Sequence, residues 1–470
     1  MLFNRPEFFI LCSLTFLVYY LPFFRKYQLI VLILSSLFFY SYTHPLLVFL
    51  LLSTMLVNTY CSYRVAKAIP QNQRMWAILG VVLNLLVLSF KYSPLFAQTL
   101  NLGGTNIGEF LLTIPLPIGI SFFTFQGITL VVDVFQRNQQ ADIASPIVSE
   151  SFLAHLKRTF LFIAFFPQLV AGPIVKAHNF YPQIQTKYLK DIDWASAVKI
   201  LIMGYFLKNV IADNLKDFTF WIQYPQFMQL STLDLLSLII AYSAQIFADF
   251  AGYSLIAIGI GRLFGYRLPQ NFNFPYISRS FSDFWRRWNM SLSSFLKEYL
   301  YIQMGGNRKG KFRTYLHLLI TMALGGLWHG AAWSYLVWGL FHGILLAIER
   351  FLKDMFAIQT RWVVFKVLQV VFIYTCVTLA WLLFKLPDFG EVVLYFKAMF
   401  YNASIKPRYT QIHNMFFYAS FVLVYHLYYV YKTQASNYKL AKLEPYLYGV
   451  LLFLIITNSG SAEEFIYFQF

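Results

Sequence analysis

Charged residues are scarce in this 470-residue sequence, where Asp, Glu, Lys and Arg together make up only 12%. A soluble domain carries about 25% charged residues, so this chain lacks the polar surface that water requires. Cysteine is scarce too, and Cys12, Cys61 and Cys376 lie far apart in or beside apolar segments. They fit neither the spacing of a zinc site nor a disulfide framework. An ordinary soluble enzyme and a disulfide-stabilised secreted domain are therefore excluded.

The catalytic motifs of soluble enzymes are also missing. The sequence has no G-x-S-x-G nucleophile elbow, no H-E-x-x-H zinc pair and no Walker loop. The stretch Gly259–Gly265 resembles a dinucleotide-binding loop only loosely, because no strand precedes it. We therefore expect neither a bound metal nor a permanently bound cofactor.

Hydrophobic residues dominate instead: they make up 59% of the chain, and aromatic residues make up 20%. Apolar runs such as Phe8–Tyr20 and Leu29–Tyr40 are long and do not alternate with polar residues. This pattern predicts transmembrane helices rather than a β-barrel, because lipid offers no partner to an unpaired backbone group. We expect an all-α, polytopic transmembrane helix bundle that forms one domain over residues 1–470. It should contain about 11–14 membrane helices or half-helices.

Two kinds of irregularity interrupt this pattern. The apolar stretch 251–266 is rich in glycine, so we expect a broken or interfacial helix there, separate from a span at 232–248. The segments Pro167–Pro173 and Pro182–Trp194 are too irregular for simple spans. Non-helical backbone at membrane depth must be buried by protein or line a water-filled cavity. These segments therefore suggest re-entrant stretches around a tunnel.

The net charge is +17, and the basic residues behind it are unevenly distributed along the chain. Lys and Arg lie mainly between the apolar runs, as in cytoplasmic loops beside anionic lipid, and this distribution argues for a lipid bilayer and against nucleic acid as the partner. Arg25 and Lys26 separate the first two runs, whereas the loop from Tyr92 to Phe110 contains no Lys or Arg. The alternation predicts an outer N-terminus and a cytoplasmic Arg25 loop.

The stretch Tyr266–Tyr315 is strongly basic and interleaved with aromatic residues. It holds two acids and nine basic residues, namely Arg267, Arg279, Arg286, Arg287, Lys297, Arg308, Lys309, Lys311 and Arg313. One interpretation is positive-inside anchoring with an interfacial aromatic belt. The other is a surface that receives an anionic donor or an acidic carrier protein, because clustered Arg binds phosphate and carboxylate well.

His329 is the most informative single residue, because it lies within an otherwise apolar run. An ionisable side chain at membrane depth is costly and usually functional. Gly325, Gly326 and Gly330 remove bulk around it, and imidazole can accept a proton near neutral pH. The alternative is a buried histidine that is hydrogen-bonded between helices. For His342, thirteen residues later and flanked by Phe341 and Gly343, we expect a structural role.

Two lone acids, Asp133 and Asp249, also lie in apolar stretches. Either could pair with an arginine or line a polar passage, and the spacing does not decide between these roles.

A series of short motifs occurs in one order along the chain: Leu116–Phe125, Gln168–Pro173, Ile211–Asn214, Phe247–Ser254, Ala257–Gly265, Asn271–Tyr276, Phe284–Trp288, Ser291–Ser293, Tyr299–Ile302, Gly305–Arg308, Gly325–Gly330 and the terminal run Phe465–Phe470. Together they resemble the membrane-bound O-acyltransferase family over roughly the whole chain. The Gly-Gly-Asn-Arg element at Gly305–Arg308 points to the bacterial alginate O-acetyltransferase-like branch.

The resemblance implies a tunnel with an essential histidine near its middle, and this role maps onto His329. The branch commonly has a second histidine after Trp-Arg-Arg-Trp, where this chain has Asn289. An amide can orient a hydroxyl or stabilise an oxyanion but cannot take a proton, so His329 would be the only base. The motifs also suggest further site residues. Those expected at the substrate or tunnel wall are Trp328, Gly326, Trp285, Arg286, Arg287, Tyr253 and Asp249, and those expected at the donor are Arg279 and Arg308.

The function that this resemblance implies is transfer of an acyl group, with acetyl as the expected group, from cytoplasmic acetyl-CoA or an acyl carrier. The acceptor would be a hydroxyl of an extracytoplasmic polysaccharide or wall polymer, and the location the bacterial cytoplasmic (inner) membrane. An extracytoplasmic SGNH-type acetyltransferase is a further expected partner. Two alternatives stay open: a transporter-like protein, although no internal repeat is visible, and a non-catalytic acyl-conducting subunit of an acetylation complex.

Overall fold

The computed structural model describes residues 1–42, 45–113, 117, 119–138, 147–149, 151–169, 172–356, 362–434, 438–461 and 465–466. These residues form two compact units, Met1–Leu201 with Ser254–Pro269 and Ile202–Tyr253 with Gln270–Phe470. The single domain expected over the whole chain stays a prediction. Parts of three motifs, at Leu116–Phe125, Gln168–Pro173 and Phe465–Phe470, lie outside the described residues.

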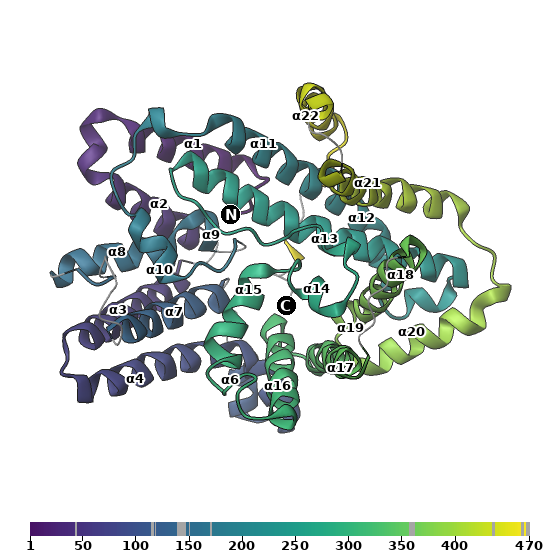
Figure 1. The fold of residues 1–470 in the computed structure, drawn as a ribbon, viewed down its shortest axis with the longest axis horizontal. Coiled ribbons are helices and arrows are strands. Elements are labelled where there is room, and N and C mark those ends of the chain that lie inside the picture. Colours follow the sequence, from purple (N-terminus) through teal and green to yellow (C-terminus); the bar gives the residue numbers. More distant parts are fainter. Residues whose placement is uncertain are drawn as a thin grey trace. The chain divides into compact units, whose positions relative to one another are not determined.

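The first unit is built from helices of very different length (Figure 1). They are α1 (Pro6–Tyr20), α2 (Gln28–Ser41), α3 (Leu47–Lys67), α4 (Pro70–Ser89), α5 (Ser93–Thr99), α6 (Asn106–Thr113), α7 (Ile120–Asn138), α8 (Phe152–Ala164), α9 (Phe166–Leu169), α10 (Ala177–Phe180) and most of α11 (Trp194–Tyr205).

Buried polar side chains join the helices of the first unit. The amides of Asn58 on α3 and Asn84 on α4 donate to each other over 3.1 and 2.8 Å. Gly127 on α7 packs directly on this pair, because a Cβ there would lie 2.5 Å from both amides. One turn further along α3, Ser62 and the ring of His155 on α8 are 2.8 Å apart. In an apolar medium such bonds hold helices together where the hydrophobic effect does not.

The second unit carries a long helix, α13 (Thr232–Leu263), whose last residues belong to the first unit. Its other elements are the π-helical turn η5 (Phe206–Ala212), α12 (Asp213–Thr219), α14 (Phe281–Trp285), α15 (Met290–Phe295), the π-helical turn η9 (Leu296–Tyr301), α16 (Lys311–His329), α17 (Trp333–Met355), α18 (Val363–Ala380), α19 (Leu382–Lys385), α20 (Phe389–Tyr401), α21 (Tyr409–Gln434) and α22 (Tyr438–Thr457).

The helix α13 differs from the sequence-based expectation of a span followed by a broken helix. It runs without a break for 32 residues, and 89% of an 18-residue apolar stretch within it is buried. Its glycines serve close packing instead of interruption. A Cβ on Gly252 would lie 2.8 Å from the backbone nitrogen of Lys208 and 2.9 Å from the carbonyl oxygen of Gly204. Glycine therefore lets two helices approach each other here, as is common in membranes.

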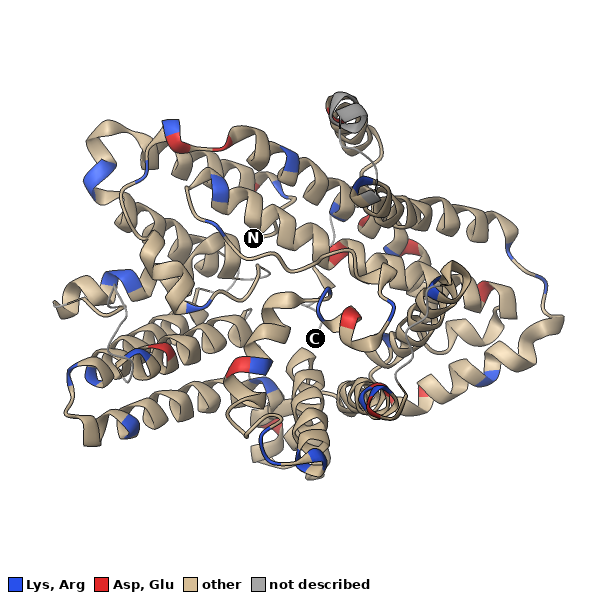
Figure 2. Cartoon of the chain, viewed as in Figure 1, with Lys and Arg blue, Asp and Glu red and all other residues tan. Residues whose placement is uncertain are grey.

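The composition of these helices confirms an all-α, multi-pass membrane protein. Among the described residues, six helical stretches are long and apolar enough to cross a membrane: Pro22–Ser41, Pro70–Thr99, Trp194–Ile222, Thr232–Leu263, Trp333–Met355 and Val363–Lys385. Large apolar side chains such as Leu34, Ile78 and Phe372 lie exposed, as expected of a surface that faces lipid. Most of the ribbon is free of charged residues (Figure 2). The expected number of crossings and the tunnel stay predictions.

Candidate active site

His329 is the last residue of α16, and aromatic rings surround it. Its side chain is buried, with the residue only 2% exposed. The ring centroids of Trp328, Trp338 and Phe384 lie 5.0, 5.1 and 5.0 Å from that of the imidazole, each nearly perpendicular to it. These rings come from α16, α17 and α19. A histidine held this way has few rotamers open to it, which favours a fixed orientation of its two nitrogens.

Two glycines bring α16 and α17 into backbone contact beside His329. A Cβ on Gly326 would lie 2.2 Å from the carbonyl oxygen of Tyr335, and one on Gly339 would lie 2.2 Å from that of Met322. No side chain larger than hydrogen fits at either position without moving a helix. Gly326, which the sequence suggested for the substrate wall, therefore serves the contact between helices.

An apolar groove of about 320 Å³ reaches His329 from the side of η9. Its apolar wall includes Trp285, Leu296, Met322 and Trp338. The volume lies within the range of about 300–1,000 Å³ that is common for small-molecule sites. We call this cavity the His329 groove. It combines one buried imidazole with an apolar lining, as an acyl chain or a thioester would require.

The other end of the His329 groove is polar. Lys297, Tyr301, Asn307 and Arg350 line it there. The hydroxyl of Tyr301 donates to the side-chain oxygen of Asn307, which also accepts from Arg350 over 3.4 Å. Burial raises the pKa of Tyr301, while the nearby Arg350 guanidinium lowers it by a smaller amount. Two cations and a neutral phenol therefore stand at this rim.

Asn289 lies in the same unit, but not among the residues that line the His329 groove. It immediately precedes α15 and is 2% exposed. Its backbone is left-handed, with φ 40° and ψ 57°. Asn, Asp and His are the non-glycine residues that accept this conformation most readily. The residue type at this position thus matches a backbone requirement, and α15 then carries Leu292 and Ser293 to the groove.

The arginines suggested by the sequence do not converge on the groove. Arg279, Arg286 and Arg308 are exposed and none of them lines it. Arg287 donates to the carboxylate of Asp283 over 3.0 Å and to the carbonyl of residue 273 over 3.1 Å, so its contacts are structural. Trp285, by contrast, lines the groove as expected. Sequence reasoning missed Arg350, because it lies on α17, well outside the basic stretch.

The two lone acids both have basic partners, but not arginines. Asp133 accepts from the backbone nitrogen and the ring Nδ1 of His178 over 3.0 and 2.8 Å. Asp249 on α13 lies 2.8 Å from the ammonium group of Lys208, which also contacts Asp213 over 2.6 Å. All three residues of this second group are at most 3% exposed. We call Lys208, Asp213 and Asp249 the ion cluster.

Tyr253, which was expected at the substrate wall, belongs to the surroundings of the ion cluster. The Lys208 ammonium lies 5.4 Å from the centroid of its ring, and the centroid of the Phe465 ring lies 4.5 Å from the same point. Lys208 itself lies on η5, where a π-helical turn interrupts the regular helix. Such turns often occur at functional sites. Sequence reasoning missed Lys208 as the partner of Asp249, because the two residues are far apart along the chain.

His342 is completely buried, and its ring contacts Trp285 and Trp338 at 5.2 and 4.8 Å. Neither ring nitrogen has a hydrogen-bond partner among the described residues. It does not line the His329 groove. These contacts agree with a packing role for His342 behind the aromatic wall.

Comparison with known proteins adds the family. The model of the membrane-bound O-acyltransferase family matches residues 102–384. A peptidoglycan O-acetyltransferase of Helicobacter pylori is 36% identical over 428 residues, which cover 85% of this chain and 80% of that protein. A probable alginate O-acetylase of Pseudomonas aeruginosa is 36% identical over 405 residues, covering 83% and 74%. A teichoic acid D-alanyltransferase of Bacillus subtilis is 29% identical over 275 residues, covering 55% and 66%.

The match extends over most of the chain and includes α16 with His329. The chain belongs to the membrane-bound O-acyltransferase family, and it is an acyltransferase of the membrane.

Proposed function

We propose that this enzyme transfers an acetyl group from a cytoplasmic thioester donor to a hydroxyl of an extracytoplasmic polysaccharide or wall polymer. Its place would be the bacterial cytoplasmic membrane. Two of the relatives are named for acetyl transfer to peptidoglycan and to alginate, which supports both the acyl group and the kind of acceptor. The observation that carries the proposal is the His329 groove, which joins a cationic rim to a buried imidazole.

The groove suits a donor with a charged end and an apolar reactive end. Lys297 and Arg350 at the rim would bind phosphates, as carried by acetyl-CoA or by the prosthetic group of an acyl carrier. The apolar wall would hold the thioester near His329. The exposed Arg308 follows Asn307 directly in sequence, so it extends the cationic surface beyond the rim. Acetyl-CoA and an acyl carrier both combine phosphate with a thioester, so the groove would suit either donor.

His329 would act as the general base. It takes the proton of the acceptor hydroxyl while the hydroxyl oxygen attacks the thioester carbonyl carbon. The new C–O bond forms, the C–S bond breaks, and the leaving thiolate receives the proton back from the imidazolium. No net proton is gained or lost. For Asn289 we propose a positioning role: its left-handed backbone starts α15, which carries Leu292 and Ser293 to the groove.

The hydroxyl that takes the acetyl group belongs either to the polymer or to an extracytoplasmic SGNH-type acetyltransferase that completes the transfer. His329 would activate both in the same way. Adding each acceptor separately to the purified enzyme distinguishes them.

The test is a His329→Gln variant assayed in membranes with radiolabelled acetyl-CoA. Losing a general base typically lowers the rate by about 10²–10⁴-fold. His413→Gln is the matched control, because this histidine is exposed on α21 and lines no described cavity. Acetylation in His329→Gln at the level of His413→Gln would refute the assignment of the base.

A second variant tests the donor groove. Arg350→Met should raise the KM for acetyl-CoA and leave kcat nearly unchanged, since the guanidinium lies at the rim and not beside the imidazole. A lower kcat at unchanged KM would contradict this placement of the donor.

A further inference from the structure

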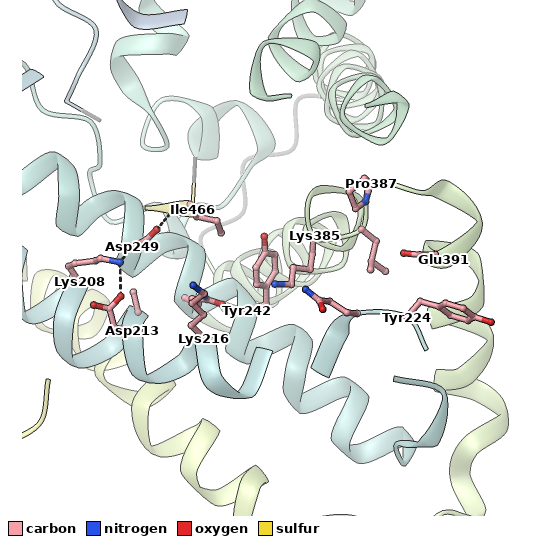
Figure 3. A pocket seen from close by; sticks show the side chains of 14 residues that line it. Lys208, Asp213, Lys216, Tyr224, Tyr242, Asp249, Lys385, Pro387, Glu391 and Ile466 are labelled. Atoms are coloured by element: carbon pink, nitrogen blue, oxygen red, sulfur yellow. Dashed lines mark hydrogen bonds and ion pairs between the residues drawn. The ribbon is translucent and has the colours of Figure 1, made fainter. Parts of the chain in front are cut away.

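A second cavity, of about 400 Å³, lies in the same unit and is lined quite differently (Figure 3). Its walls come from α12, α13 and the turn between α19 and α20. Side chains of both charges meet there with amides and tyrosines, including Lys216, Tyr242, Gln245, Lys385 and Glu391. We call it the polar cavity. Because both signs of charge line it, it favours neither a simple anion nor a simple cation.

Tyr242 is the most telling residue of the polar cavity. It is 1% exposed, and its hydroxyl has no hydrogen-bond partner among the described residues. A buried hydroxyl without a partner is unfavourable, so such groups are rarely kept unless something binds them. The Lys385 ammonium lies over the Tyr242 ring, 5.4 Å from its centroid, so a cationic donor stands beside this ring. Figure 3 shows both side chains at the same wall.

The ion cluster also lines the polar cavity, and its members hold one another in place. The carboxylate of Asp249 also accepts from the backbone nitrogen of Ile466 over 2.7 Å. Gln245 accepts at its side-chain oxygen from Thr219 over 2.5 Å, which leaves its amide nitrogen as the donor. A ligand would thus meet preset donors and acceptors rather than mobile side chains.

The polar cavity lies toward the N-terminal end of α13. At 1.5 Å per residue, Tyr242 lies roughly 15 Å from the first residue of the helix. Gln223 and Tyr224, which also line the polar cavity, precede the start of α13.

The polar cavity lies next to the rings around His329 along α19. Lys385, which lines the polar cavity, directly follows Phe384 in that helix. The Tyr335 ring packs on Phe384 at 5.1 Å, and Phe384 packs on His329 at 5.0 Å. Phe384 therefore packs on the imidazole and lies one residue from the wall of the polar cavity.

We infer that the polar cavity binds a pyranose unit of the acceptor polymer. A sugar offers hydroxyls that both donate and accept, together with an apolar C–H face that can pack on a tyrosine ring. The polar cavity supplies the counterparts: Lys385 and the Gln245 amide as donors, Glu391 and Asp249 as acceptors, and Tyr242 as hydroxyl and ring. The volume is in the range of small-molecule sites. This inference rests on the proposed transfer to a polysaccharide.

The test measures binding separately from transfer. The purified enzyme in nanodiscs is titrated with two soluble tetrasaccharides, a neutral N-acetylglucosamine oligomer and an acidic uronate oligomer, by calorimetry. At least one should bind. Tyr242→Phe removes a single hydroxyl, so the variant should bind that oligomer about 2- to 10-fold more weakly, as expected for one hydrogen bond. Its thermal stability should not fall, because the hydroxyl that it loses makes no hydrogen bond among the described residues.

Tyr395→Phe is the matched control. This buried tyrosine donates to the carbonyl of Leu235 over 3.0 Å and does not line the polar cavity. Its loss should lower stability and leave saccharide binding unchanged. If neither oligomer binds, or if Tyr242→Phe binds as tightly as the unaltered enzyme, the inference is wrong. Binding of a purified SGNH-type protein in place of both oligomers would also overturn it.

Failure of the proposed function gives a different result. His329→Gln should lose acetyl transfer and keep saccharide binding, because His329 lies outside the polar cavity. Active transfer in that variant would contradict the role of the base and leave the sugar titration unaffected.

Discussion

Replacing Gly326 with alanine should inactivate the enzyme while the protein still folds. The added Cβ would lie 2.2 Å from the carbonyl oxygen of Tyr335 and 2.9 Å from the Cα of Gly339. Both obstacles are backbone atoms on α17, so no side-chain rotation relieves the clash. The two helices must separate by roughly 1 Å, at an overpacking cost of about 1–3 kcal/mol.

The shift would act directly on the His329 groove. Gly326 lies one turn before His329 on α16, and Tyr335 lies one turn before Trp338 on α17. His329 and Trp338 both line the groove. A misplacement of roughly 1 Å can lower a rate by about 10²-fold. We therefore expect a loss of about this size in kcat.

The assay compares Gly326→Ala with Gly449→Ala. A Cβ on Gly449 in α22 would meet no atom within 4 Å, so that variant should keep its activity. Acetyl transfer from a labelled donor is measured together with the melting temperature of each purified variant. Full activity of Gly326→Ala at unchanged melting temperature would refute the view that this contact positions His329.

Three further outcomes follow from the structure. Asn289→Gly should keep more activity than Asn289→Ala, since a left-handed backbone costs an ordinary residue about 1–2 kcal/mol; equal losses in transfer assays would instead indicate a direct role for the amide. Lys208→Met should destabilise the protein by about 3–5 kcal/mol, because it strands two buried carboxylates, and an unchanged thermal unfolding curve would contradict the ion cluster. In a cysteine-free background, Thr105→Cys should react with an impermeant reagent from outside and Gln71→Cys should not; the opposite labelling would invert the topology.

The helical membrane fold could be predicted from composition alone, because few charges and long apolar runs permit little else in lipid. The comparisons confirm the family that the motifs suggested. The position of His329 also stood out, since an imidazole in an apolar, glycine-rich run is unusual. Its surroundings did not, because Trp338 and Phe384 reach it from other helices.

Contacts between distant segments account for what the sequence could not predict. Glycine lowers helix propensity, so the 251–266 stretch suggested a break. In the structure Gly252 instead lets the η5 region approach α13, and the helix continues. The partners of Asp249 and the cation at the groove rim are also far away in sequence. Hydropathy and local spacing predict neither the ion pair of Asp249 nor the position of Arg350 at the groove.

The rings around His329 have a consequence for the membrane as a barrier. Trp338, Trp381 and Phe384 are at most 1% exposed, and Trp381 packs on Trp338 at 5.6 Å. A file of water molecules needs polar partners along its path, and aromatic faces provide few. In an enzyme that meets a donor from one face and an acceptor from the other, a continuous water path would let protons and ions leak across the membrane. The aromatic layer would allow an acyl group to pass while it blocks such a path.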